Sequence, residues 1–199
     1  MNYDLLIIFF SYLCGSIPFG LVISYIFKKD DPRSIGSKNI GATNVLRTAG
    51  VMLGLFTLIL DILKGFIAIK ITLMLNSDMI GLSMTFVIIG HIFPIWLKFK
   101  GGKGVASYMG FMLATSWPLF IILITTWLVI VKIFKYSAVA AIVSILINLI
   151  SFKIILFSQF KYNILLWIKG DPIEFHFILF ISIIILIKHY TNVINIFKK

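Results

Sequence analysis

Two polar segments of this sequence contain the residue types that bind anions. The first, residues 31–47, combines small residues, hydroxyls and amides with two arginines, Arg33 and Arg47. Small residues let backbone N–H groups approach an anion, and hydroxyls and amides add donors. The planar guanidinium of arginine matches the oxygens of a phosphate or carboxylate. The segment indicates an anion site, although an ordinary solvated loop with basic residues has the same composition.

The second segment, residues 90–106, places Gly101, Gly102, Lys103 and Gly104 directly before an apolar run. A glycine-rich turn that enters a helix offers unpaired N–H groups and the positive end of the helix dipole, to which the lysine adds a charge. It is not a Walker A loop, because Leu97 and Gly104 occupy the positions that require Gly and Ser or Thr. A second anion site is one interpretation, and a flexible basic turn is the other.

Ionisable residues also occur inside the apolar segments. Asp61 and Lys64 lie three residues apart on one predicted helix face, where they form either a structural ion pair or a substrate contact. His91 is more typical of a hydrogen-bonded structural histidine. Near the end of the chain, His189 and Asn192 also share a helix face, and a histidine there can move a proton or bind phosphate.

Composition decides which solvent surrounds these sites. Of the 199 residues, 60% are hydrophobic and only 13% are charged, whereas a soluble domain has roughly 45–50% apolar and about 25% charged residues. The chain is therefore predicted to lie in a lipid bilayer. Its net charge of +11 is typical of bacterial membrane proteins with basic cytoplasmic loops, and no nucleic-acid partner is expected. Cys14 stands alone in an apolar run, so no internal disulfide is available.

The apolar runs predict the spans. Clear candidates are residues 5–27, 51–75, 79–97, 138–157 and 173–187. Residues 105–134 are too long for one crossing, since a helix of that length runs about 45 Å, and Pro118 interrupts them after Ser116. If they cross twice, Lys132, Lys135 and the tail residues Lys188, Lys198 and Lys199 fall inside, as the positive-inside rule favours.

The expected fold is thus an all-α polytopic membrane protein, a single domain over residues 1–199. It has seven transmembrane helices, an N-terminus outside and a cytoplasmic C-terminus. The start of the chain lacks the basic region of a secretory signal, so the first apolar run is expected to be a permanent span. The long polar segment 28–50 is expected to be a cytoplasmic loop. All the polar clusters then face the cytoplasm, and two anion sites beside a lipid-accessible bundle suit two phosphorylated substrates.

The whole chain resembles the bacterial acyl-phosphate-dependent glycerol-3-phosphate acyltransferase family. The matching segments, in family order, are 15–20 (GSIPFG), 36–47 (GSKNIGATNVLR), 61–65 (DILKG), Gly90 and His91 with Pro94, 99–106 (FKGGKGVA), and His189 with Asn192. The resemblance implies transfer of an acyl group from acyl phosphate to the sn-1 hydroxyl of glycerol 3-phosphate, giving lysophosphatidic acid and phosphate. This is the first acylation of phospholipid synthesis, on the cytoplasmic face of the inner membrane.

The resemblance also implies roles for individual residues. Catalytic candidates are Ser37, Arg47, Lys103, His189 and Asn192. Substrate-binding candidates are Asn39, Thr43, Asn44, Lys64, Lys100, Gly101, Gly102, Gly104 and Ser137. The proton of the acceptor hydroxyl goes either to His189 or to the phosphate of the substrate itself. No cofactor and no metal are expected, and an acyl-phosphate synthase is a candidate partner.

Three positions depart from the family pattern. Lys38 stands where the family usually has glycine, Asn195 replaces a commonly basic residue, and the Gly-x-Glu ending of the family is not found before Lys199. Other classes fit less well. Acyl-CoA-type acyltransferases need an aspartate five positions after a histidine, where this chain has Trp96, Ile181 and Ile194. A transporter of phosphorylated solutes typically has inverted repeats, and this sequence shows no repeat.

Overall fold

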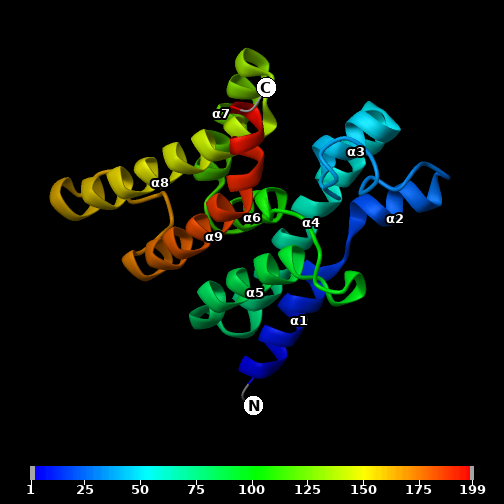
Figure 1. Cartoon of the computed structure of the whole chain (residues 1–199). Helices are drawn as coiled ribbons and strands as arrows, with labels where there is room; N and C mark the ends of the chain where they lie inside the picture. Colours follow the sequence, from blue (N-terminus) through cyan, green and yellow to red (C-terminus); the bar gives the residue numbers. More distant parts are fainter. Residues whose placement is uncertain (1–2, 198–199) are drawn as a thin grey trace. The chain divides into compact units, whose positions relative to one another are not determined.

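The structure, a computed structural model, describes residues 3–197. Two of the tail lysines, Lys198 and Lys199, lie outside the described residues, as does the side chain of Asn195. Within this part of the chain all regular structure is helical (Figure 1). The elements are α1 (Asp4–Ser16), α2 (Phe19–Ile26), α3 (Ala42–Ala49), α4 (Val51–Leu75), η1 (Ser77–Met79), α5 (Ile80–Ile92), η2 (Ile95–Leu97), α6 (Val105–Thr115), α7 (Trp117–Phe134), α8 (Ser137–Tyr162) and α9 (Pro172–Phe197).

Several of these helices are long and apolar enough to cross a membrane. Among the described residues five qualify alone, and α1 with α2, which bend by 44° at their break, make a sixth if the pair is one span. The predicted all-α, multi-pass membrane fold is confirmed. The seventh predicted span would be α6, which has 11 residues and is therefore only about 16 Å long, roughly half of the hydrocarbon core.

The first predicted span, residues 5–27, is broken at Pro18. Proline has no N–H to donate and disfavours helical geometry in the residue before it. Ile17 accordingly takes an extended conformation, with φ −63° and ψ 116°, and ends α1. The break leaves backbone carbonyls without helical partners, so other segments must satisfy them.

One element was not predicted. Residues 28–50 were expected to be a loop throughout, but residues 42–49 form α3. Its first residue follows Gly41 and its last precedes Gly50, whose φ of 96° suits glycine and ends the helix. Val45 is fully buried against the neighbouring helices. At eight residues, α3 has only about two turns and lies within a polar segment, so it is too short for recognition from sequence.

By their internal contacts the residues divide into two compact units, Met1–Phe111 and Met112–Lys199. In the first unit α1 packs along α5 (Figure 1), and small residues allow the approach. A side chain at Gly15 would meet the backbone of Val87, and one at Gly90 would meet that of Tyr12. The unit thus brings the start of the chain against the helix that leads into residues 98–104.

A cluster of buried hydroxyls also joins α1, α4 and α5. The Ser11 and Ser83 hydroxyls lie 2.8 Å apart, and the Thr72 hydroxyl donates to Ser83 Oγ at 2.8 Å. In lipid such interhelical hydrogen bonds help to fix the packing of helices.

In the second unit α7 packs on α8, and α8 on α9. The Asn148 side chain on α8 donates to the Leu119 carbonyl of α7 at 2.7 Å. Phe152 of α8 and Phe175 of α9 pack edge to face, with ring centroids 5.8 Å apart.

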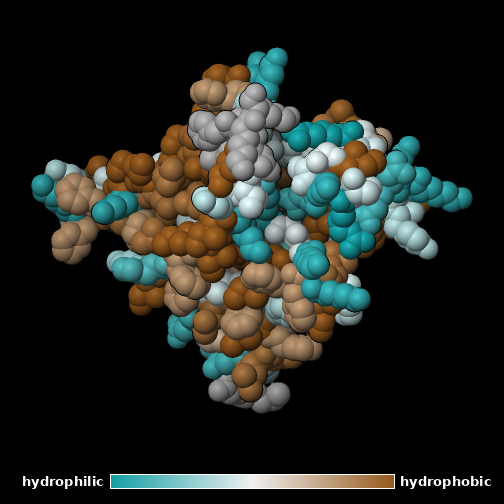
Figure 2. All heavy atoms as spheres, in the orientation of Figure 1, coloured by the Kyte–Doolittle hydropathy of each residue, from teal (hydrophilic) through white to brown (hydrophobic). Residues whose placement is uncertain are grey.

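The surface agrees with a lipid environment. Many large apolar side chains are exposed, among them Leu5 and Phe160 at 82% and 92%. Hydrophilic side chains gather around α2, α3 and their connecting segment, whereas hydrophobic ones cover much of α8 (Figure 2). The predicted anion-binding segment 31–47 therefore belongs to the polar part of the surface.

Candidate active site

Asn44 organises the first polar segment from a buried position on α3. Its side-chain amide donates to the carbonyl oxygens of Pro32 at 2.5 Å, Asn39 at 2.9 Å and Ile35 at 3.1 Å. Its oxygen accepts the N–H of Ser37 at 2.9 Å. One side chain, 1% exposed, therefore holds the loop that carries Ser37 in a fixed conformation. This arrangement is a scaffold, and the prediction that Asn44 contacts substrate stays a prediction.

The two arginines of this segment have different surroundings. Arg33 forms a forked ion pair with Asp31, with its terminal nitrogen 2.6 Å from Asp31 Oδ2. Hydrogen bonds from Arg33 hold the pKa of the Asp31 carboxyl below its ordinary value. Arg47 is exposed on α3, so its guanidinium is the one that α3 presents to solvent. Ser37 is likewise exposed, while Asn39 and Thr43 are half-buried.

Lys38 has a left-handed backbone, with φ 55°. Residues with a Cβ disfavour this region, by about 1–2 kcal/mol, and glycine does not. This conformation accounts for the glycine that the resembled family usually has here. The lysine adds an exposed charge beside Ser37.

The second polar segment folds back on the end of α5. The N–H of Gly101 donates to the Ile92 carbonyl at 3.0 Å, and the N–H of Gly102 donates to the His91 carbonyl at 3.0 Å. The expectation that these glycine N–H groups are unpaired is therefore wrong in this structure. The turn that permits the reversal is made by Lys98 and Phe99, both with positive φ.

Further backbone donors lie at the start of α6. Its first turn closes with the bond from the Tyr108 N–H to the Gly104 carbonyl. The N–H groups of residues 105–107 precede that bond and have no partner within the helix, which leaves a positive end suited to an anion. Lys103 lies beside this end and is half-buried. Burial lowers the pKa of its ammonium to about 8. Lys100 is exposed.

Gly102 and Gly104 are required for different reasons. A Cβ at position 102 would collide with the imidazole of His91. Gly104 has φ 90°, which a residue with a side chain rarely adopts. The glycines thus allow the turn to lie against His91 and then to enter α6.

Beneath this segment lies a buried polar cluster in α4, α5 and α6. The Lys64 ammonium lies 2.8 Å from Asp61 Oδ1, and both side chains are at most 3% exposed. The same ammonium donates to the Ile17 carbonyl, at the break between α1 and α2, at 2.9 Å. His91 Nδ1 lies 3.3 Å from Ser107 Oγ and 3.8 Å from Asp61 Oδ1. The ion pair is present in the structure, and the prediction that Lys64 contacts substrate stays a prediction.

The remaining predicted site residues belong to the second unit. Ser137 is the first residue of α8 and is half-buried. His189 is buried on α9, and its Nδ1 lies 2.8 Å from the Ile185 carbonyl. A carbonyl only accepts, so Nδ1 carries the hydrogen in this contact and Nε2 is the nitrogen able to take a proton. Asn192 is half-buried, and its Oδ1 lies 3.5 Å from the Thr191 hydroxyl.

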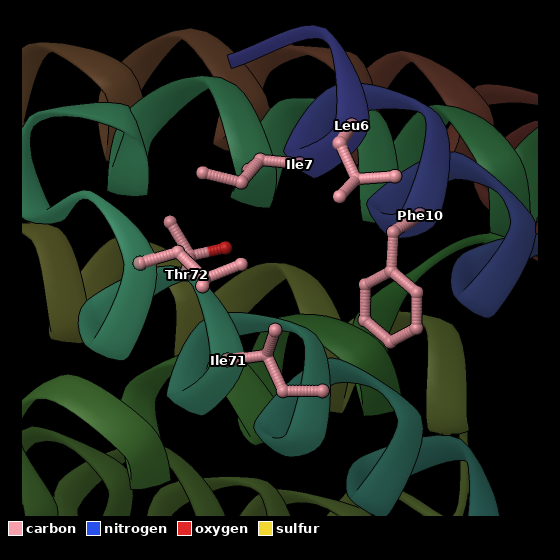
Figure 3. A pocket seen from close by; sticks show the side chains of 6 residues that line it. Leu6, Ile7, Phe10, Ile71 and Thr72 are labelled. Atoms are coloured by element: carbon pink, nitrogen blue, oxygen red, sulfur yellow. The ribbon is translucent and has the colours of Figure 1, made fainter. Parts of the chain in front are cut away.

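An apolar cavity of about 150 Å³ opens between α1 and α4 (Figure 3). It is lined by Leu6, Ile7, Phe10, Ile71, Thr72 and Leu75. The Thr72 hydroxyl, the only polar side-chain group of that lining, already bonds to Ala68 and Ser83. Ile71 is ten residues beyond Asp61, which corresponds to about 15 Å along α4. A phosphate would find no donors there, so this cavity is no candidate for the anion site.

Sequence reasoning missed two contributors to the site. Ser107 looks like any small residue of an apolar helix, and only the packing of α6 on α5 pairs it with His91. The indole N–H of Trp96 donates to Ser16 Oγ at 2.9 Å, which ties η2 to the break after α1. No signal in the sequence pairs these residues. Within residues 3–197 no three His, Cys, Asp or Glu side chains gather as metal ligands do.

Comparisons with known proteins find the same kind of relative by sequence and by structure. A family model described as glycerol-3-phosphate acyltransferase matches residues 5–199. A protein of that name from Bartonella henselae is 44% identical over 194 residues, covering 94% of this chain and 85% of the relative. One from Ehrlichia canis is 40% identical over 200 residues, covering 100% and 97%.

Two crystal structures of an integral membrane glycerol 3-phosphate acyltransferase, PlsY, are also similar. The glycerol 3-phosphate form superposes with a TM-score of 0.85 at 30% identity, covering 99% of this chain and 93% of that one. The lysophosphatidic acid form gives 0.83 at 29% identity, with the same coverage.

Proposed function

The chain belongs to the glycerol-3-phosphate acyltransferase family, and we propose that it transfers the acyl group of an acyl phosphate to the sn-1 hydroxyl of glycerol 3-phosphate. The products are 1-acyl-glycerol 3-phosphate (lysophosphatidic acid) and inorganic phosphate. One of the similar crystal structures is a glycerol 3-phosphate form and the other a lysophosphatidic acid form, which supports this acceptor and this product.

The observation that carries the proposal is the arrangement around Lys103. Lys103 lies two residues before the first residue of α6, where the N–H groups of the first turn have no helical partner. The charge of Lys103 and the positive N-terminal end of α6 together favour binding of a phosphoryl group. In an acyl phosphate this group is both the part that the protein can bind and the leaving group. We therefore assign the donor's phosphate to Lys103, Gly104 and the start of α6, with the exposed Lys100 nearby.

We assign the acceptor's phosphate to the segment held by Asn44. Ser37 and Arg47 are exposed there, and Asn39 and Thr43 lie beside them. Arg33 is committed to Asp31, so Arg47 is the guanidinium that can bind a second anion. A charge-assisted fork on phosphate is among the stronger hydrogen bonds.

The reaction needs alignment more than covalent chemistry, because an acyl phosphate is an activated mixed anhydride. The sn-1 oxygen attacks the carbonyl carbon, the carbon–oxygen bond to the phosphate breaks, and phosphate leaves with the bonding electrons. The hydroxyl proton goes to Nε2 of His189 or to a phosphate oxygen of the substrate. Ser137 and Asn192 are proposed to orient these groups. The protein stabilises charge on the carbonyl oxygen and on the leaving phosphate.

We further propose that the site faces the cytoplasm from the inner membrane. The basic residues gather in segments 28–50 and 98–104 and at the end of the chain, as in cytoplasmic loops. Soluble glycerol 3-phosphate then reaches the site from the cytoplasm, and the acyl chains remain in the bilayer. An acyl-phosphate synthase is proposed as the partner that supplies the donor.

The test is an assay of the purified protein in lipid with defined donors. Acyl phosphate and glycerol 3-phosphate should give lysophosphatidic acid and release phosphate one for one, without added metal. Acyl-CoA and acyl carrier protein thioesters should be inactive in its place. Robust turnover with acyl-CoA, or an absolute requirement for Mg²⁺, would contradict the assignment of the donor.

A further inference from the structure

The buried cluster under residues 98–104 is a continuous chain of contacts. It begins at the Ile17 carbonyl, where the first span bends, and passes to the Lys64 ammonium at 2.9 Å and then to Asp61 at 2.8 Å. His91 Nδ1 lies 3.8 Å from the same Asp61 oxygen and 3.3 Å from Ser107 on α6. Four segments that are distant in sequence therefore meet through four side chains.

His91 joins this chain to the glycine turn from two sides. Its carbonyl accepts the N–H of Gly102 at 3.0 Å, and its ring fills the space that a side chain at position 102 would need. The same ring contacts Ser107, in the first turn of α6. A displacement of His91 must shift both the residue before Lys103 and the helix that follows it.

Neighbouring glycines make this junction tight. A side chain at Gly65, next to Lys64, would meet the carbonyl of Ser107, and one at Gly110 would meet that of Ile62. The backbones of α4 and α6 thus approach closely on either side of the ion pair. The junction has little room to adopt a second packing.

Stability alone does not explain why the charged side chains of Asp61 and Lys64 are buried at this junction. Removing two ions from water is costly, and a well-packed apolar pair often stabilises a helix junction as well or better. Buried ionic groups can instead specify one arrangement among several, since their hydrogen bonds are satisfied in only one register. At this junction the ion pair lies in the same cluster as His91, on which the glycine turn packs.

We propose that Asp61, Lys64 and His91 are positioning residues, which hold the glycine turn against the bend of the first span and thereby fix Lys103 and the start of α6. The inference rests on the proposed function in taking this turn as the site for the donor's phosphate. The proposal predicts different effects on the two substrates. Loss of the network should weaken the handling of acyl phosphate far more than that of glycerol 3-phosphate, whose assigned residues are held by Asn44 instead.

The experiment compares His91→Leu with His91→Asn, Ser107→Ala and the control Ser83→Ala. Asparagine keeps a polar atom near the place of Nδ1, whereas leucine removes it. Ser107→Ala deletes one partner of His91 with the smallest change in volume. Ser83→Ala deletes a buried hydroxyl of the same helix, α5, from the cluster with Ser11 and Thr72, and so reports what a loss of packing alone does.

Two readouts are combined. Steady-state kinetics give KM for each substrate, and hydrogen exchange followed by mass spectrometry gives the protection of residues 98–104. We expect His91→Leu to raise KM for acyl phosphate by about tenfold or more with KM for glycerol 3-phosphate within about threefold, and to accelerate exchange in residues 98–104 by about tenfold. His91→Asn should recover most of both losses, and Ser107→Ala should show a smaller change in the same direction. Ser83→Ala should alter neither.

The outcomes separate the two proposals. If His91→Leu and Ser107→Ala leave exchange in residues 98–104 as it is in Ser83→Ala, or raise KM for both substrates equally, the positioning role is overturned. If His91→Leu does not fold, the comparison of Ser107→Ala with Ser83→Ala decides. If the wild-type protein does not use acyl phosphate at all, the proposed function fails, and exchange in residues 98–104 still decides whether His91 positions the turn.

Discussion

Lys64 and Asp61, three residues apart on α4, form an ion pair of 2.8 Å in which both side chains are at most 3% exposed. The Lys64 ammonium also bonds to the Ile17 carbonyl, so both of these polar contacts lie within the first unit. The sequence left a structural pair and a substrate contact as equal alternatives. The observed contacts favour a structural pair that serves the site indirectly.

The first prediction is that Asp61 and Lys64 are coupled in their effects on the free energy of unfolding. Asp61→Asn or Lys64→Met alone leaves one buried charge without its counter-ion, and each should destabilise the protein by about 3–5 kcal/mol. The double variant removes both charges and should recover most of that loss. Thermal unfolding of the purified variants in one detergent measures the coupling. Additive losses in the double variant would contradict a mutual pair.

The second prediction concerns Gly102 and His91. Gly102→Ala should lower kcat/KM for acyl phosphate, because the new methyl group collides with the imidazole. The Gly102 N–H is already bonded to the His91 carbonyl, so the loss should be steric and should depend on the ring. In an His91→Ala background, where space is available, Gly102→Ala should cause little further loss. Equal losses in both backgrounds would show that the ring is not the obstacle.

Much of the fold could be predicted because apolar length and proline are local signals. The bounds of α4 coincide with the predicted run 51–75, and the break between α6 and α7 falls at Ser116, as predicted. Pro18 is an equally local signal, but the prediction of one span over residues 5–27 missed the break that it causes. The helix α3 was missed because it is short and lies within a polar segment.

The site was predictable only as a set of segments. Glycines, lysines and arginines at close spacing indicate anion binding wherever they occur, so residues 31–47 and 98–104 could be found. The partners of each residue depend on packing between distant segments. Neither the engagement of the Gly101 and Gly102 N–H groups nor the contact of Ser107 with His91 has a signature in one sequence.

The third prediction is a pH dependence that arises from Lys103. Burial lowers the pKa of its ammonium to about 8, so the free enzyme loses this charge as pH rises through that value. If the charge binds the donor's phosphate, kcat/KM for acyl phosphate should be constant below about pH 8 and fall above it. Lys103→Arg should be less active, since a planar fork does not replace a point charge. Its residual activity should lack this alkaline fall, because arginine stays charged. An identical fall in both proteins would assign it to another group.

The fourth prediction uses the two arginines of the first segment as a matched pair. Arg47→Ala should lower kcat/KM for glycerol 3-phosphate at least about 100-fold, because a charged hydrogen bond to phosphate is lost. Arg33 is engaged by Asp31 on the surface, and such pairs contribute little. Arg33→Ala should therefore change kcat/KM less than about threefold. Similar losses in both variants would reduce the role of Arg47 to general surface charge.

The last prediction decides the number of spans. Because α6 has only 11 residues, residues 105–134 cross twice only if α6 completes a short passage within the protein. Single cysteines at positions 38, 135 and 169, in a Cys14→Ala background, distinguish the alternatives when intact bacterial cells are treated with an impermeant thiol reagent. With seven spans, positions 38 and 135 react only after permeabilisation, and position 169 reacts from outside. With six spans, positions 135 and 169 exchange sides while position 38 does not. Lys132 and Lys135 favour the first result, because basic residues are retained in the cytoplasm. Labelling of position 135 in intact cells would remove the seventh span and place the C-terminal end of α9 outside.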